Sequence, residues 1–544
     1  MPSGTGAHRG FVPLLGSPVG RGALAVLAGA LPALAFPAPG LWWFAYVALV
    51  PLLLLVRSAR TGRRAALDGW LGGTGYMLAV HHWLMPSLHV FIVVLAALLG
   101  LLWAPWGLLA RRMLRGPLSA ASAAAAVVVV PCGWLMTETV RSWEGLGGPW
   151  GLLGASQWQV APALRLASVG GVWLVTLWVV AVNTALVLLV AAPAPARRAA
   201  LGSLVVAASA VGAVAAWAPR PEPSGTAAVA VVQPGIVDGP GSVERRFARS
   251  EALTRSLAGQ NVDLVVWGES SVGVDLARHP EVTARIAALS RQVGADVLVN
   301  VDARQTDASG RTGIFKSAVL VGPRGLTGDR YDKMRLVPFG EYVPARSALG
   351  WATSMGRAAG EDRLRGTGPV TMALPDAGGL RIGPLVCFES AFPDMSRRLA
   401  RDGARILVAQ SSTSSFQHSW APLQHASLAA LRAAENGRPA VHATLTGVSA
   451  VYGPRGEEIG TRLGTGTSGT GVYAVPLARG TTLYARLGDW PLYGALGVLL
   501  VLCAAEGVRY ARRRGGPGAA APGPGAAPEH SGDARAEAPA ETGP

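Results

Sequence analysis

The chain alternates between long apolar segments and a central region of much shorter apolar runs. Seven long segments precede residue 220, and an eighth lies near Trp490–Val508. Each approaches the ~20 residues that a helix needs to cross a bilayer. The pattern predicts a membrane domain of seven spans over residues 1–220 and a C-terminal transmembrane helix over residues 484–508. The first seven spans are expected near Ala23–Ala38, Leu41–Val56, Ala66–Met85, Leu88–Ala110, Leu118–Thr137, Leu166–Val190 and Leu201–Trp217.

Residues 226–478 have a different texture, in which runs typical of buried strands alternate with helical patterns such as Pro280–Val293 and Leu423–Glu435. Such alternation indicates a layered α/β domain that can bury a substantial core. The expected strands are Ala227–Val232, Val262–Trp267, Ala295–Val301, Ser317–Val321, Leu380–Val386, Arg405–Ala409, Ala440–Ala443 and Val472–Val475.

Basic residues follow every second span, which predicts the orientation of the chain. Clusters of arginine follow spans two, four, six and eight, and all four fall on one side if the N-terminus is cytoplasmic. The α/β domain is then expected outside the cytoplasm and the C-terminus inside it. The Ala-, Pro- and Gly-rich segment 509–544 is predicted to be a disordered tail. The clusters begin at Arg57, Arg111, Arg197 and Arg509.

Composition supports a membrane protein. Half of the residues are hydrophobic and only 15% are charged, which is unlike an ordinary soluble protein. The net charge of +16 comes from arginines beside apolar runs, so it indicates topology rather than a nucleic-acid partner. Cys132 and Cys503 lie inside apolar segments, so no disulfide framework is expected. The histidines near the ends of spans three and four lack nearby carboxylates or thiols, so no metal site is expected.

Three residues of the α/β region lie where strands end or turns begin. Cys387 follows a buried strand, Glu269 ends the run Leu264–Glu269, and Lys333 lies in Tyr331–Pro344. Each alone has an ordinary explanation as a core thiol, a surface carboxylate or a surface lysine. Together they supply the nucleophile, the base and the cation that covalent acyl transfer requires, and the backbone N–H of Phe388 can complete an oxyanion hole.

A Gly- and Trp-rich loop, residues 141–157, separates spans five and six and is too polar to face lipid. It is either a plain connection or an interfacial element at the mouth of a lipid-entry site. The string Gly464–Gly469 matches G-x-G-x-x-G, but it precedes a strand instead of opening a helix, so no dinucleotide cofactor is expected.

The segment Tyr331–Pro344, Tyr-x-Lys-x-x-Leu-Val-Pro-Phe-Gly-Glu-Tyr-Val-Pro, resembles the signature of the apolipoprotein N-acyltransferases, the membrane-embedded branch of the nitrilase (carbon–nitrogen hydrolase) superfamily. The resemblance covers nearly the whole chain. It includes the seven-plus-one spans and several shorter motifs, namely Gly147–Gln157, Gln233-Pro234, Trp267-x-Glu269, Cys387-Phe-Glu389, Pro422-x-Gln-His425 and Leu483–Trp490.

The resemblance implies an α-β-β-α sandwich of nitrilase type joined to a multi-span helical membrane domain. It implies a catalytic triad of Glu269, Lys333 and Cys387, supported by Glu341 and Glu389. By the same resemblance, substrates contact Trp267, Tyr342, Trp150, Gln424 and His425.

The implied reaction is ping-pong and needs no metal or organic cofactor. Cys387 takes the sn-1 acyl chain of a phospholipid such as phosphatidylethanolamine as a thioester. The α-amine of the diacylglyceryl-cysteine of an apolipoprotein then accepts that chain, which is the last step of lipoprotein maturation. The resemblance implies a monomer in the cytoplasmic membrane, with its catalytic domain on the extracytoplasmic side.

The sequence departs from the family pattern at three places. Gly268 stands where the family usually has proline, and the segments Ser412–Phe416 and His442–Gly447 keep little of the family motifs. The altered Ser412–Phe416 loop leaves a catalytically silent lipoprotein-binding paralogue as one alternative. A second alternative is a membrane-anchored amidase with water as acceptor, against which the full motif up to Pro344 and the seven preceding spans argue. A transporter is disfavoured because the apolar spans contain almost no internal charges.

Overall fold

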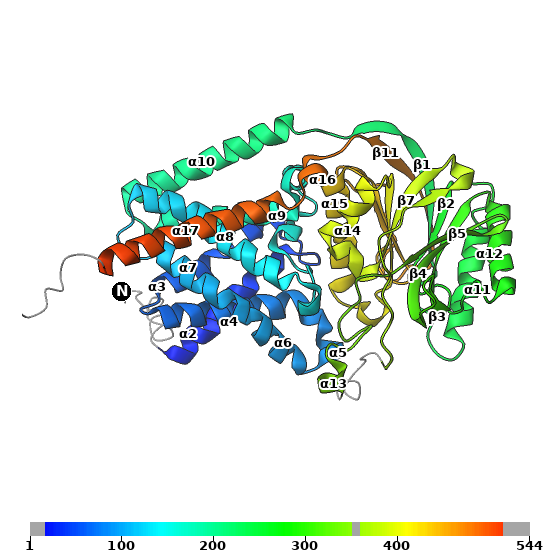
Figure 1. The fold of residues 1–544 in the computed structure, drawn as a ribbon, viewed down its shortest axis with the longest axis horizontal. Coiled ribbons are helices and arrows are strands. Elements are labelled where there is room, and N and C mark those ends of the chain that lie inside the picture. The colour runs from blue at the N-terminus through cyan, green and yellow to red at the C-terminus, as the bar shows by residue number, and fades with distance from the viewer. Residues whose placement is uncertain (1–16, 351–359, 515–544) are drawn as a thin grey trace, which may run out of the picture. The chain divides into compact units, whose positions relative to one another are not determined.

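A computed structural model describes residues 17–350 and 360–514. Its N-terminal part is a set of packed helices, and the described residues up to Val498 form one compact unit (Figure 1). The helices of this part are α2 (Pro18–Ala30), α3 (Val50–Ser58), α4 (Gly62–His81), α5 (Met85–Leu88), α6 (Phe91–Gly100), α7 (Ala104–Leu114), α8 (Ala120–Arg141), α9 (Ala161–Ala191) and α10 (Ala194–Trp217).

Six helical stretches of the described residues are long and apolar enough to cross a membrane. The second predicted span corresponds to a shorter apolar stretch, Trp42–Ser58. The third corresponds to α4, which has 20 residues but carries Arg63, Arg64 and Asp68 near its start. The number of eight spans therefore stays a prediction. The six stretches are Pro18–Ala35, Phe91–Leu114, Ala120–Arg141, Ala161–Ala191, Ala194–Trp217 and Trp490–Arg512.

The last helix corrects the predicted boundary of the tail. Helix α17 runs from Trp490 to Arg514, so the basic residues after Val508 are helical and not disordered. Lysine and arginine are good helix formers, and the preceding apolar helix continues through them without a proline or glycine stop. The remainder of the predicted tail, 515–544, lies outside the described residues.

The α/β region contains two sheets that face each other. The first has six strands in the order β11-β1-β2-β3-β4-β5, and the second has five in the order β10-β9-β8-β7-β6. Strands β1, β2 and β3 of the first sheet are parallel to one another, as are β7, β8 and β9 of the second sheet. The remaining strands of each sheet pair in antiparallel fashion. The strands are β1 (Glu222–Gln233), β2 (Leu264–Trp267), β3 (Asp296–Thr306), β4 (Thr312–Gly322), β5 (Gly325–Asp332), β6 (Met372–Leu374), β7 (Leu380–Val386), β8 (Ile406–Ser411), β9 (Ala440–Thr444), β10 (Ala450–Tyr452) and β11 (Gly469–Arg479).

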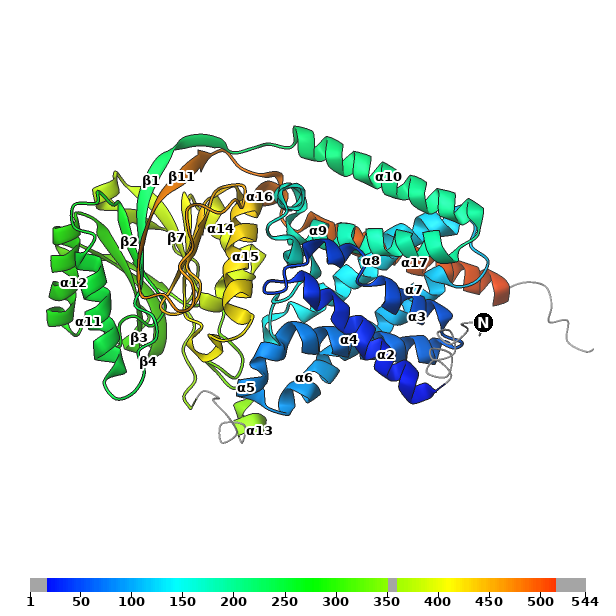
Figure 2. The ribbon, with the colours of Figure 1, turned by 180° about the vertical axis from the view of Figure 1, so that it is seen from behind.

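Helices cover the outer faces of both sheets, giving the expected α-β-β-α layers (Figure 2). Helices α11 and α12 cover the first sheet, and α14 and α15 cover the second and lie on the side of the membrane helices. Strands β2 and β8 are buried along their whole length, which explains their continuous apolar runs. The helices are α11 (Ser242–Arg255), α12 (Pro280–Val293), α13 (Arg346–Leu349), α14 (Pro393–Arg401), α15 (Ala421–Asn436) and α16 (Leu483–Leu487).

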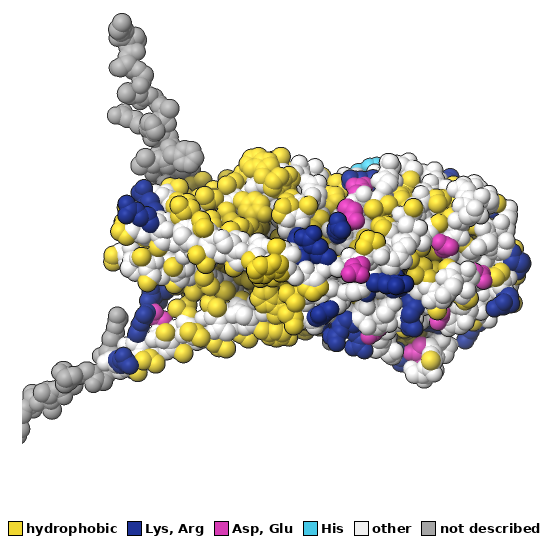
Figure 3. Space-filling view, turned by 90° about the horizontal axis from the view of Figure 1, so that it is seen from above, with side chains coloured by type: hydrophobic (Ala, Val, Ile, Leu, Met, Phe, Trp, Pro, Cys, Tyr) yellow, Lys and Arg dark blue, Asp and Glu magenta, His cyan; other side chains and the backbone are white. Residues whose placement is uncertain are grey.

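Side-chain chemistry divides along the same line. On the face that Figure 3 shows, hydrophobic side chains gather over the helical part, which has a few basic side chains at its far end, while most charged side chains lie over the α/β part. Exposed apolar side chains such as Val206, Trp217 and Leu98 would be costly in water and are expected on helices that lipid surrounds.

A break in helix α9 joins the two parts. The backbone leaves the helical conformation at Gly170 and Gly171, and the N–H of Val172 donates to Glu435 Oε1 of α15 at 2.8 Å. Gly171 has φ +68°, and a Cβ there would lie 2.6 Å from the ring of Tyr484, so glycine is required. Arg432 donates to the same Glu435 oxygen at 2.8 Å. A buried ion pair of the α/β part therefore caps the N-terminal end of the segment of α9 that follows the break.

Candidate active site

Cys387 lies where strand β7 ends and a short 3₁₀ turn begins. Its φ of +52° is in the left-handed region, which is uncommon for a residue with a side chain. Its carbonyl oxygen accepts from Ser390 Oγ at 3.0 Å and contacts His425 Nε2 at 3.0 Å. These contacts hold the strained backbone, and the side chain stays partly exposed.

Four charged side chains form a cluster beside this thiol, which we call the charge cluster: Glu269, Lys316, Lys333 and Glu341. Lys333 Nζ lies 2.8 Å from Glu341 Oε1 and 3.4 Å from Glu269 Oε1. Lys316 Nζ lies 2.8 Å from Glu269 Oε1 and 3.2 Å from Glu341 Oε1. Two ammonium groups therefore share the same two carboxylate oxygens.

The electrostatics of the charge cluster keep the thiol protonated and the carboxylate ionised. Burial alone would raise the pKa of Glu269, but the ammonium groups of Lys316 and Lys333 outweigh burial and lower that pKa to about 2. Burial, followed by the negative charge of Glu269, raises the pKa of the Cys387 thiol to about 12. The neighbouring Cys387 side chain lowers the pKa of the Glu269 carboxyl further. The resting pair is thus a thiol beside a carboxylate.

Glu389 fixes the chain around the site rather than entering the charge cluster. Its Oε2 accepts from the backbone N–H of Val386 at 2.8 Å. Its Oε1 accepts from the Tyr331 hydroxyl at 2.7 Å and from the N–H groups of Met334 at 2.7 Å and Arg335 at 3.0 Å. One carboxyl group therefore ties the strand before the cysteine to the segment after the lysine.

His425 and Gln424, both on α15, are buried. Since the Cys387 carbonyl can only accept, Nε2 of His425 carries the proton, and Nδ1 accepts from Ser411 Oγ at 3.0 Å. Gln424 accepts from the indole of Trp150 at 3.0 Å, and the Trp150 ring lies 5.2 Å from that of His425. The Gly- and Trp-rich loop of the membrane part therefore packs directly behind the cysteine.

The remaining predicted residues divide between the site and the core. Trp267 was predicted to contact a substrate, but its side chain is fully buried and presents no surface to one. It donates to Thr254 Oγ1 at 3.0 Å and fills the core under α11. Tyr342 is partly exposed beneath Arg365, 5.1 Å from its guanidinium. Phe388 is buried against Phe392, with ring centroids 5.0 Å apart.

Gly268 and the segment His442–Gly447, two of the departures noted in the sequence, touch each other. A Cβ at position 268 would lie 1.9 Å from the backbone nitrogen of Leu445. Proline carries such a Cβ, so this chain accommodates the close approach of the segment only with glycine at 268. Beside this contact, the Glu269 N–H donates to the Ser411 carbonyl at 3.1 Å.

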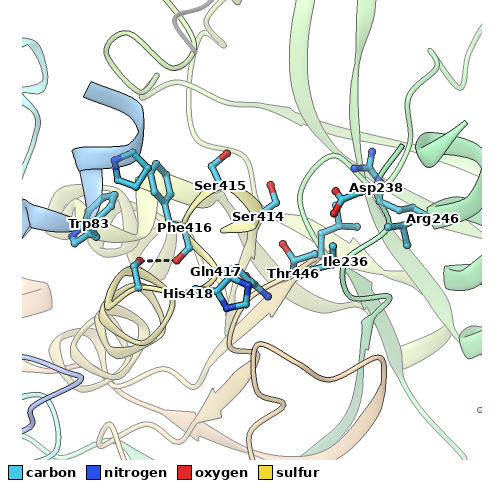
Figure 4. Close-up of a pocket in the computed structure, with 14 residues that line it drawn as sticks. Trp83, Ile236, Asp238, Arg246, Ser414, Ser415, Phe416, Gln417, His418 and Thr446 are labelled. Atoms are coloured by element: carbon cyan, nitrogen blue, oxygen red, sulfur yellow. Dashed lines mark hydrogen bonds between the residues drawn. The ribbon is translucent and has the colours of Figure 1, made fainter. Parts of the chain in front are cut away.

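A pocket of about 370 Å³ opens beside the same segments. Figure 4 shows Trp83 of the membrane part and Phe416 on one side, and Asp238 and Arg246 on the other. The rings of Trp83 and Phe416 meet edge to face, with centroids 4.9 Å apart. The altered segment 412–416 thus contributes Ser414, Ser415 and Phe416 to a pocket wall.

Sequence reasoning missed Lys316, the cation nearest Glu269. It lies in strand β4, where an isolated lysine among apolar residues looks like a solvated strand position. The Lys333 N–H bonds the Lys316 carbonyl at 2.9 Å, so the two lysines are neighbours across adjacent strands. Among the described residues, no group of three or more metal-binding side chains occurs.

Comparison with known proteins matches both parts of the chain. Residues 228–484 match the carbon–nitrogen hydrolase family, and residues 28–185 match the apolipoprotein N-acyltransferase N-terminal domain. Apolipoprotein N-acyltransferase of Azotobacter vinelandii is 34% identical over 92% of this chain and 96% of that protein. The one of Geobacter metallireducens is 31% identical over 88% of this chain and 94% of that protein. The chain belongs to the apolipoprotein N-acyltransferase family.

Among solved structures, an amidase from Nesterenkonia sp. matches with a TM-score of 0.34 and 19% identity, over 49% of this chain and 95% of that one. The C. elegans NitFhit protein matches with a TM-score of 0.36 and 18% identity, over 47% of this chain and 62% of that one. The apolipoprotein N-acyltransferase family differs from a lone hydrolase domain in its membrane part, and this chain carries both.

Proposed function

We propose that this protein is an apolipoprotein N-acyltransferase that carries the acyl chain on Cys387. The observation that carries the proposal is the charge cluster beside a strained, partly exposed thiol, in a chain whose membrane part and α/β part both match the family. The substrates are lipids and lipoproteins, and the protein is integral to a membrane.

In the first half-reaction, Cys387 Sγ attacks the sn-1 ester carbon of a phospholipid such as phosphatidylethanolamine while the thiol proton passes to Glu269. The Lys333 ammonium stabilises the developing oxyanion. Collapse breaks the ester C–O bond, and the Glu269 proton passes to the departing alkoxide. The products are a thioester on Cys387 and a lysophospholipid, and Glu269 is again a carboxylate.

In the second half-reaction, the neutral α-amine of the diacylglyceryl-cysteine of an apolipoprotein attacks the thioester carbon. Glu269 takes a proton from the amine nitrogen as the C–N bond forms. Collapse breaks the C–S bond, and the Glu269 proton returns to the sulfur. An amide is formed, and the thiol and the carboxylate are restored without any cofactor.

The membrane setting suits both substrates. Entry from the lipid side avoids moving acyl chains through water, which costs about 0.8 kcal/mol per CH₂. The four basic clusters favour cytoplasmic termini, an extracytoplasmic catalytic domain and the cytoplasmic membrane. We further propose that the membrane domain spans 1–220 and the catalytic domain 226–478, and that the enzyme acts as a monomer.

The test is intact-protein mass spectrometry of wild type and Cys387→Ala after incubation with phosphatidylethanolamine vesicles. The proposal expects an added acyl mass on wild type alone. The mass should disappear from the enzyme when a diacylglyceryl peptide with a free amine is supplied, and it should appear on that peptide. Transfer to water alone would identify a hydrolase, and an adduct on Cys387→Ala would move the nucleophile elsewhere.

A further inference from the structure

Lys316 is the nearest cation to the carboxylate that handles protons in the proposed reaction. Its Nζ lies 2.8 Å from Glu269 Oε1, whereas that of Lys333 lies 3.4 Å away. Lys316 also faces Glu341 at 3.2 Å and Asp302 at 3.8 Å, and Arg363 lies 3.6 Å from Asp302. Its side chain is 13% exposed, so solvent screens it little.

The composition of the chain sets these two lysines apart. Of its 48 Lys and Arg residues, two are lysines, Lys316 and Lys333, and every other basic position carries arginine. Arginine presents a broad planar fork, whereas lysine presents a compact point charge. Two cations that share the same two carboxylate oxygens need the compact group. Both lysines of this arginine-rich chain are thus found in the charge cluster.

We propose that Lys316 is a positioning residue of acyl transfer, which holds Glu269 through Oε1 and favours release of the Glu269 proton to the departing alkoxide. The inference rests on the acyl-transfer function proposed above. The two lysines then have separate tasks. Lys333 stabilises the oxyanion, and Lys316 favours proton release from Glu269.

The proton balance explains why the second cation matters. When Glu269 accepts the thiol proton, its negative charge is lost and Lys316 loses its closest partner. Passing that proton to the alkoxide restores the 2.8 Å pair. Lys316 therefore makes protonated Glu269 a stronger acid, at the expense of its strength as a base. The benefit depends on the leaving group: a lysophospholipid alkoxide needs the proton, and a p-nitrophenolate does not.

The experiment compares two acyl donors in single-turnover acylation of Cys387, followed by intact mass. For Lys316→Met, the rate with phosphatidylethanolamine vesicles should fall about tenfold to hundredfold, the range for one general-acid contribution. The rate with a p-nitrophenyl ester of the same acyl chain should stay within about threefold or rise. Lys316→Arg keeps the charge and should lose less than Lys316→Met with the phospholipid.

Arg363→Met is the matched control, because it removes a neighbouring positive charge that contacts Asp302 and not Glu269. In this variant, the ratio of the acylation rate with phosphatidylethanolamine to the rate with the p-nitrophenyl ester should equal the wild-type ratio. Equal losses with both donors in Lys316→Met would overturn the proposal in favour of a structural role. No loss with the phospholipid would overturn it as well.

A second measurement uses the wild-type enzyme and does not depend on the folding of a variant. Protein labelled with ε-¹³C-lysine should give two lysine resonances, and both should stay in the ammonium position up to pH 10. An amine-like shift of either resonance below pH 9 would contradict the shared ion pairs. If wild type forms no adduct with either donor, the proposed function fails; if wild type acylates but the donor ratio is unchanged in Lys316→Met, only the role of Lys316 fails.

Discussion

Two buried groups of charges in this enzyme are built in opposite ways. In the charge cluster, two ammonium groups share Glu269 Oε1 and Glu341 Oε1, and a partly exposed thiol adjoins them. In the pair Arg432–Glu435, the guanidinium donates to Glu435 and to the Ala391 carbonyl, and the carboxylate receives the backbone N–H of Val172. In the first group the charges share oxygens beside a thiol, where we propose that a proton is transferred, whereas the second group has fixed partners and holds elements together.

The role of a buried ion pair can thus be inferred from the partners of its charges. Charges with fixed partners in backbone groups serve architecture. Charges that compete for one oxygen beside a nucleophile can change state during a reaction. Glu389 resembles the architectural class, since three backbone N–H groups and one hydroxyl hold it.

The largest effect is expected for Glu269→Gln, which removes the proton acceptor from the charge cluster. Acyl-enzyme formation from phosphatidylethanolamine should fall about 10²- to 10⁴-fold, the usual contribution of a general base. Single-turnover mass spectrometry measures the rate, with Cys387→Ala as the blank. A wild-type acylation rate in Glu269→Gln would show that another group is the base. The charge cluster would then no longer differ in role from the pair Arg432–Glu435.

Glu435→Ala should instead act on stability. It leaves Arg432 without its carboxylate and the N–H of Val172 without an acceptor, at a cost of about 3–5 kcal/mol for a broken buried pair. The midpoint of thermal unfolding in detergent should fall. The acylation rate per folded molecule should stay within about threefold, because one general acid or base is worth far more than that. A selective loss of rate with an unchanged midpoint would move this pair into the catalytic class.

Alkylation of Cys387 should depend steeply on pH, unlike that of a free cysteine. The thiol pKa is raised to about 12, so the thiol stays protonated through neutral pH and ionises only as the pH rises toward that value. Iodoacetamide labelling should increase about tenfold per pH unit between pH 8 and 11, whereas free cysteine levels off above its pKa of about 8.5. Peptide mapping of Cys387 gives the rate, and a plateau below pH 9 would contradict the raised pKa.

The smallest effect is expected for Tyr331→Phe, which removes one of the four donors to Glu389. The lost hydrogen bond should cost about 1 kcal/mol of stability. Acylation should remain within about threefold of wild type, with an unchanged donor preference, because a merely structural hydrogen bond of that size does not touch the reacting atoms. A shift in the pH profile of acylation would instead assign Glu389 to the catalytic class.

Much of this site could be predicted because its residues sit at strand ends. Cys387 and Glu269 each follow a buried apolar run, and such positions converge at one end of a layered α/β domain. Lys333 directly follows the polar strand β5 and was found through the motif Tyr331–Pro344. Lys316 could not be found this way, since it lies inside strand β4 and its partners come from other segments. Its signal was compositional: it is one of two lysines in the chain.

Trp267 was assigned wrongly for a related reason. Strand β2 ends at Trp267, so the regular alternation of the strand does not extend to Glu269, and closeness in sequence does not place the indole in the site. The strands themselves were largely predicted, because continuous apolar runs mark buried parallel strands. Strand β5 and helix α11 were missed, since their polar residues face solvent and give weak periodic signals.

The broken helix α9 has a consequence for biogenesis. While the chain is being inserted, the second half of α9 begins with an N–H at Val172 that has no acceptor from its own helix. Its acceptor is translated more than two hundred residues later, on α15, so the bundle cannot reach its final form during insertion. Completion of the membrane part therefore waits for the aqueous domain to fold and to bring Glu435 to Val172.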